Sequence, residues 1–453
     1  MIRSTLVAIS LLSAAPLAAQ APQEILEERY DRALAAGYKA LFLCGAIANA
    51  ERAGITRTPE SVHAWELTGV QAPLDQIIRD LPFEIVRGGN GAIAHVSVEW
   101  ADEMPPRFAV HRLDHGCSIY PIGFLEADLP TPSEAEPTRL LARQMPLTKG
   151  YNSFNLERTQ FFDETYGEGT RTTAVIVTNG LDEQAFYADG FGPFTPQRTW
   201  SVAKSIAATI IGAVSHRLDA EMTASAGLGD GPLDPRRAIT VDHLLRMASG
   251  RYSDTPGNRT NAIYYGGGTV EEWASGWPLV HEPGSQFRYA NNDTLMAFDA
   301  FREALEDNPV PDLLRSFGMR RTVAETDWQG RYVLSSQVWA TAPDLLALGK
   351  LYLENARGSG RSGILPEGWT RYVSTPSGPQ PEGRSWGYGA GFWLFNNHEG
   401  IPADTFFAAG NRGQYVVIVP SRDVVIVRRG EDPAGSRFDI EAFTRDVMAA
   451  LDK

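Results

Sequence analysis

The segment RTWSVAKSIAATIIGAV, residues 198–214, places a serine and a lysine three positions apart at the head of an apolar run. On a helix, residues three apart lie on one face, so the amine of Lys204 can reach the hydroxyl of Ser201. Burial can lower the pKa of a lysine into the neutral range, whereas an arginine keeps its charge. The pair could therefore supply a nucleophile and the base that activates it.

The same pair also fits a structural interpretation, in which Ser201 caps a helix and Lys204 extends to solvent. The chain has only five lysines among its 41 basic residues, so a lysine here is unusual. Twenty-six serines and five lysines still predict about 0.3 chance matches to Ser-x-x-Lys. This segment alone supports the two interpretations equally.

A second segment, HEPGSQFRYANNDTLMAF, holds a tyrosine and an asparagine that could act with this pair. The hydroxyl of Tyr289 can relay protons to and from a Ser/Lys pair if nearby cations lower its pKa. Asn291 could hold a substrate carbonyl or anchor Lys204. The Tyr-x-Asn pattern is common, and a tyrosine at this place would often be a core residue.

Four segments together resemble the serine β-lactamase and penicillin-binding-protein superfamily, in order and in spacing. They are SVAK (201–204), ITVDHLLRMASG (239–250), HEPGSQFRYANND (281–293) and AAGNRGQYVVIVP (408–420). The resemblance covers residues 165–453, and the nearest likeness is to class C β-lactamases and their esterase and 6-aminohexanoate-dimer hydrolase relatives. It implies an α+β fold, a β-lactamase-like antiparallel sheet flanked by helices with a helical subdomain.

Roles for four residues follow from this resemblance. It implies that Ser201 is the acylated nucleophile and that Lys204 is its activating partner. Tyr289 would relay protons, and Asn291 would bind the substrate amide or belong to the Lys204 network.

The third family motif departs from the usual pattern. Residues 408–410 are Ala-Ala-Gly where the family has Lys-Thr-Gly or a histidine variant. The strand can still supply backbone at Gly410, and the N–H groups of Ser201 and Asn411 would form the oxyanion hole. The missing cation helps to bind the carboxylate of β-lactam antibiotics, so the departure argues against efficient lactam hydrolysis. Arg412 is near enough in sequence to replace it.

The elements that must position these residues follow from apolar periodicity. A helix should begin at Ser201, and two strands should form a hairpin at Asn179-Gly180. Strands are also expected in residues 413–430, before a closing helix at 439–451. Strands at both ends of a helical middle predict an α+β domain whose sheet is built from both termini. The aromatic loop 251–268, with Tyr252, Tyr264 and Tyr265, is predicted to wall the substrate pocket.

Other classes of site find little support. His111, Asp114 and His115 could mimic metal-ligand spacing, but no further cluster completes a site, and we expect neither a metal nor another cofactor. No Gly-x-Ser-x-Gly elbow is present, which disfavours an α/β-hydrolase. The net charge is −14 and no basic run occurs, which argues against nucleic acid and anionic membranes as partners.

The first residues predict export. Residues 1–19 have an early positive charge, an apolar stretch and small residues, the plan of a signal peptide cleaved after Ala19. A retained anchor is disfavoured because the apolar stretch is short for a bilayer. Export makes a disulfide between Cys44 and Cys117 plausible, with two buried thiols as the alternative.

Residues 22–150 are predicted to form an N-terminal accessory domain that ends in the Pro-rich linker 129–150, and residues 151–453 the hydrolase domain. We expect a secreted or periplasmic serine hydrolase that cleaves an ester or amide through an acyl-serine intermediate. A true β-lactamase or D,D-peptidase is the first alternative. A penicillin-binding-like protein with weak or no turnover is the second.

Overall fold

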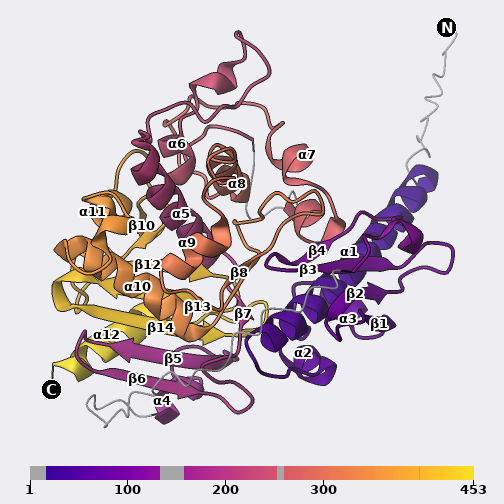
Figure 1. Cartoon of the computed structure of the whole chain (residues 1–453), viewed down its shortest axis with the longest axis horizontal. Helices are drawn as coiled ribbons and strands as arrows, with labels where there is room; N and C mark the ends of the chain where they lie inside the picture. Colours follow the sequence, from indigo (N-terminus) through magenta and orange to yellow (C-terminus); the bar gives the residue numbers. More distant parts are fainter. Residues whose placement is uncertain (1–16, 133–157, 253–259, 397, 453) are drawn as a thin grey trace, which may run out of the picture.

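The computed structural model describes residues 17–132, 158–252, 260–396 and 398–452. Most of the predicted signal peptide and of the predicted linker therefore lie outside the described residues. Figure 1 shows a layered sheet-and-helix body with the N-terminal helix α1 and a small sheet at its side.

A seven-stranded antiparallel sheet forms the centre, with strand order β10-β11-β12-β13-β14-β5-β6. Strands from both ends of the predicted hydrolase region therefore lie side by side, as expected. The hairpin is confirmed, because β5 and β6 pair antiparallel across this turn. The side chain of Asn179 accepts hydrogen bonds from the N–H groups of Leu181 and Asp182 in the turn. The strands are β5 (Thr172–Thr178), β6 (Glu183–Tyr187), β10 (Gly387–Tyr388), β11 (Trp393–Leu394), β12 (Phe406–Gly410), β13 (Gln414–Val419) and β14 (Val424–Gly430).

Helices cover both faces of this sheet. Successive side chains of a strand point to opposite faces. On β5, Ala174 and Ile176 accordingly join the core beneath α5 and α10, whereas Val175 and Val177 pack with α12. The helices in this part are α4 (Arg158–Phe162), α5 (Val202–Leu218), α6 (Val241–Leu245), α7 (Val270–Ala274), α8 (Asn291–Asp299), α9 (Val310–Ser316), α10 (Ala342–Arg357), α11 (Trp369–Ser374) and α12 (Ile440–Leu451).

Helix α5 is the central helix, and residues 202–215 of it are all buried. Beside it, a three-stranded sheet has the order β7-β9-β8, formed by Gln197–Arg198, Val338–Ala340 and Val323–Ala324. Strand β7 ends just before the helix begins. The N-terminus of α5 is thus held between this small sheet and the end of β12, where Gly410 approaches Ser201.

The N-terminal unit consists of α1 (Leu17–Arg52), α2 (Pro59–Trp65), α3 (Leu74–Ile78) and a four-stranded antiparallel sheet. Its strands are β1 (Phe83–Arg87), β2 (Ile93–Val98), β3 (Arg107–Arg112) and β4 (Gly116–Ile119). The disulfide Cys44–Cys117 is present and joins α1 to β4, which confirms that prediction. The division into two domains stays a prediction, since one buried apolar cluster runs from α1 through α5 and α10 to one face of the central sheet.

Among the described residues, one helix, Pro22–Arg52, is long and apolar enough to cross a membrane. Its apolar part is wholly buried inside the protein. Here that segment serves as a core helix, with the small sheet packed along it (Figure 1).

Candidate active site

Ser201 lies at the N-terminus of α5 and is partly exposed. It occupies the N-cap position, yet its side chain makes no capping hydrogen bond. The preceding residue, Trp200, has a φ of 51°, a left-handed conformation that turns the chain sharply at the serine. The hydroxyl is therefore presented to the site instead of capping the helix.

Lys204 is 2% exposed, so it does not extend to solvent. Its Nζ donates to Ser201 Oγ at 3.0 Å, to Asn291 Oδ1 at 2.7 Å and to the Ser335 carbonyl at 2.9 Å. Burial lowers the pKa of Lys204 from 10.5 to about 7. None of its three contacts is a carboxylate, so nothing in this network opposes the desolvation that favours the neutral amine.

Asn291 is the first residue of α8, and it anchors the lysine. While its oxygen accepts from Lys204, its Nδ2 donates to Thr260 Oγ1 at 2.9 Å. An amide oxygen accepts a hydrogen bond without adding a negative charge. It therefore positions the amine without raising its pKa as a carboxylate would.

Tyr289 is half-buried beside the pair, with Lys204 Nζ 5.0 Å from its ring centroid. Burial raises the pKa of Tyr289 to about 12, although hydrogen bonding with Ser201 and Trp393 and the charge of Arg384 oppose the shift. The expected lowering by nearby cations is therefore outweighed. Tyr289 is a protonated donor at neutral pH, and Lys204 is the group whose pKa suits a base.

Strand β12 runs directly against the nucleophile. An ideal Cβ on Gly410 would lie 2.4 Å from the Thr199 carbonyl oxygen and 3.2 Å from the backbone nitrogen of Ser201. Only glycine permits this approach. Asn411 follows at the exposed turn after the strand. The structure thus brings Gly410 and the start of α5 together.

The cation that the family motif usually provides is not replaced by Arg412. Ala408 is fully buried on β12, and Arg412 points away from the serine into the N-terminal unit. Its guanidinium donates to Glu431 at 2.8 Å and to the carbonyls of Trp65 at 2.7 Å and Gly69 at 3.0 Å. Closeness in sequence left this replacement open, and Arg412 does not provide it, because α2 and the loop after it supply the acceptors of its guanidinium.

The predicted aromatic wall is only partly realised. Tyr265 is 2% exposed and packs 4.9 Å from the ring of Tyr38 on α1, so the prediction that it lines the pocket is wrong. Tyr264 is buried behind the site, and its hydroxyl bonds to Ser335 Oγ at 2.7 Å. Tyr252 is 41% exposed and packs on Trp277, while residues 253–259 of this loop lie outside the described residues.

Three contributors were not predicted from the sequence. Ser335 acts through its backbone carbonyl, which residue type does not reveal. Trp393 lies 5.2 Å from the ring of Tyr289, and the guanidinium of Arg384 lies 5.6 Å from the Trp393 ring. The aromatic-rich segment RSWGYGAGFW, residues 384–393, was the available signal for this pair.

A serine with a buried lysine and a tyrosine at the edge of a helix-covered antiparallel sheet is the arrangement of a serine hydrolase-type enzyme. The chain belongs to the Beta-lactamase family, whose family model matches residues 160–429, more than half of its length. This family acts on small-molecule substrates.

Two solved structures show the same fold. A protein from Bacillus anthracis assigned as a 6-aminohexanoate-dimer hydrolase is 21% identical with a TM-score of 0.51, over 62% of this chain and 78% of that one. A protein from Bacteroides dorei DSM 17855 assigned as a β-lactamase has the same identity and TM-score, over 65% and 97% of the two chains. Among curated proteins, no sequence matches this chain.

Proposed function

We propose that the protein is an exported serine hydrolase that cleaves a small ester or amide through an acyl-serine intermediate. The observation that carries the proposal is the 3.0 Å hydrogen bond between Ser201 Oγ and a buried Lys204 whose pKa is about 7. If Lys204 had only a structural role, the folded protein would be more stable with the amine extended to solvent, because burying an amine costs free energy. Here the amine instead donates to the hydroxyl of Ser201, which makes no capping hydrogen bond to the helix.

In the first half of the reaction, Ser201 Oγ bonds to the substrate carbonyl carbon and its proton passes to neutral Lys204. The negative oxygen of the tetrahedral intermediate is held by the backbone N–H groups of Ser201 and Asn411. In the described part of the chain, neither N–H has another acceptor, which supports this role. Collapse of the intermediate breaks the bond to the leaving group.

The leaving group needs a proton as it departs, and we assign its donation to Tyr289, whose side chain hydrogen-bonds with Ser201. The tyrosine is then reprotonated by the Lys204 ammonium, so both groups return to neutral. In the second half, water attacks the acyl carbon, gives a proton to Lys204, and Ser201 regains its proton from the lysine. The order of the two pKa values supports Lys204 as base and Tyr289 as acid.

The substrate is proposed to be an ester or an open-chain amide without a required carboxylate. The support is Ala408 on β12 and the outward direction of Arg412, which leave this strand without a cation at the site. A β-lactamase or D,D-peptidase remains the second candidate, favoured by the family match. The disulfide supports export to a periplasmic or extracellular location.

The test is covalent labelling of the mature protein with a fluorophosphonate, followed by intact mass and peptide mapping. We expect one adduct, on Ser201, and turnover of p-nitrophenyl esters. Ser201→Ala should abolish both, whereas Ser377→Ala, at an exposed serine, should change neither. A folded wild-type protein without an adduct would refute the proposal. Nitrocefin turnover faster than ester turnover would favour the β-lactamase alternative. A burst of acylation without turnover would favour a penicillin-binding-like protein.

A further inference from the structure

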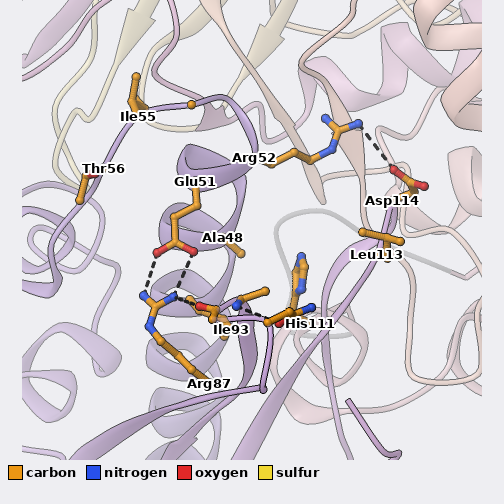
Figure 2. A pocket seen from close by; sticks show the side chains of 14 residues that line it. Ala48, Glu51, Arg52, Ile55, Thr56, Arg87, Ile93, His111, Leu113 and Asp114 are labelled. Atoms are coloured by element: carbon orange, nitrogen blue, oxygen red, sulfur yellow. Dashed lines mark hydrogen bonds and ion pairs between the residues drawn. The ribbon is translucent and has the colours of Figure 1, made fainter. Parts of the chain in front are cut away.

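A second site lies in the N-terminal unit, apart from the serine. It is a cavity of about 330 Å³ at the carboxyl end of α1 (Figure 2). Its walls come from residues 48–56, from the turn between β1 and β2, and from the end of β3 with the turn that follows. None of the lining residues belongs to the Ser201 network, so the cavity needs an explanation of its own.

One ion pair of this cavity is fully hydrogen-bonded. Arg87 donates to both carboxylate oxygens of Glu51, at 2.7 and 3.2 Å, and to the Gly91 carbonyl at 2.8 Å. This two-pronged geometry satisfies both charges. Figure 2 shows the pair on one wall, joining α1 to the end of β1. We assign it to the structure of the cavity rather than to a ligand.

The opposite wall carries an ion pair without a hydrogen bond between its partners. Arg52 and Asp114 approach only to 3.8 Å, which is longer than a hydrogen bond. The side chain of Arg52 is 12% exposed and that of Asp114 is 42% exposed. A guanidinium carries five N–H donors. Within the described chain, those of Arg52 reach no acceptor at hydrogen-bonding distance, so a nearly buried cation faces the cavity with its donors uncommitted.

Two further features define what could fill the space. His111 hydrogen-bonds to the backbone of Ile93, and burial lowers the pKa of its ring, so it is neutral at pH 7. The remaining wall includes the apolar side chains of Ile55, Ile93 and Leu113. The cavity therefore joins an apolar surface to a positive and a negative group that stand side by side.

We propose that this cavity binds a free α-amino acid with an apolar side chain. The ligand carboxylate would take two hydrogen bonds from Arg52, and its ammonium would pair with Asp114. Arg52 and Asp114, 3.8 Å apart, would place a positive group next to the ligand carboxylate and a negative group next to the ligand ammonium. The side chain would lie against Ile55 and Leu113. A volume of about 330 Å³ is at the lower end of the usual range for small-molecule sites.

Calorimetric titration of the mature protein with L-leucine tests this proposal. We expect saturable binding, and at least tenfold weaker binding of 4-methylvalerate, which lacks the ammonium, and of isoamylamine, which lacks the carboxylate. Arg52→Gln and Asp114→Asn should each weaken leucine binding at least tenfold. Arg79→Gln, at a 63% exposed arginine of the same unit, is the matched control and should leave it unchanged.

The proposal is overturned if leucine gives no saturable heat, if 4-methylvalerate binds as tightly as leucine, or if both cavity variants bind like the wild type. Should Arg52→Gln fail to fold, Asp114→Asn decides, because the Asp114 side chain is 42% exposed and asparagine keeps its size. Hydrolysis is not used as a readout, so the result is independent of the proposed catalytic function.

Discussion

The substitution Lys204→Arg separates a catalytic lysine from a structural one. Arginine keeps a positive charge and can still donate to Asn291 and to the Ser335 carbonyl, so the hydrogen-bonding role is retained in part. What it loses is the neutral form, since a guanidinium is not deprotonated in proteins. If Lys204 takes the proton of Ser201, acylation must fail in this variant even though the fold survives.

The size of the effect follows from the shifted pKa. With a pKa of about 7, half of the Lys204 side chains are neutral at pH 7, against about 0.03% for a pKa of 10.5. The difference is about 1,500-fold in available base, or about 4 to 5 kcal/mol. Because the active form is the neutral amine, the rate of acylation should rise with pH through about 7 and then level off. Tyr289, with a pKa of about 12, should add no falling limb below pH 10.

The assay is the rate of fluorophosphonate labelling and of p-nitrophenyl ester turnover between pH 5 and 10. Lys204→Arg should lower both by about 10³-fold. Lys350→Arg is the matched control, because Lys350 is 38% exposed and pairs with Glu183 far from the serine. Near wild-type labelling in a folded Lys204→Arg protein, or a rising limb centred near pH 5 or pH 10, would refute the assignment of Lys204 as the base.

Three further outcomes are expected. Tyr289→Phe keeps the ring contact but removes the proton donor, so amide turnover should fall by about 10²-fold or more. Turnover of p-nitrophenyl esters should fall far less, because their leaving group needs no proton. Equal losses would contradict an acid role. Gly410→Ala puts a Cβ 2.4 Å from the Thr199 carbonyl oxygen, so it should slow acylation at least tenfold and cost about 1–3 kcal/mol in a denaturant titration. Replacing Cys44 and Cys117 by alanine opens a link across 73 residues, which should lower the free energy of unfolding by about 4 kcal/mol; an unchanged midpoint would show that the bond stabilises little.

The parts of the fold that the sequence predicted are those set by local pattern. In the hairpin at Asn179, the asparagine side chain accepts hydrogen bonds from N–H groups of its own turn. The Val- and Ile-rich strands β13 and β14 pair with each other and are adjacent in sequence. Ser201 and Lys204 are one helical turn apart, so their contact is also local. These interactions involve residues close enough in the chain for spacing to define their geometry.

The errors concern side chains whose direction is set by distant segments. Arg412 lies two residues after the end of β12, but α2 and its following loop provide its acceptors more than three hundred residues earlier in the chain. Tyr265 is drawn into the core by Tyr38 of α1. Neither partner can be inferred from local spacing. Ser335 was missed for another reason, since any residue type can offer a backbone carbonyl.

The N-terminal unit contributes to the geometry of the nucleophile. Trp200, which directly precedes Ser201, holds a left-handed conformation that costs a non-glycine residue about 1–2 kcal/mol. Such a conformation persists only where its surroundings enforce it. Here the guanidinium of Arg198 lies 4.6 Å from the Trp200 ring and 4.9 Å from the ring of Phe42, and Phe42 belongs to α1. Because α1 completes this stack, we infer that the serine keeps its position only when the N-terminal unit is docked, so the unit is part of the catalytic scaffold.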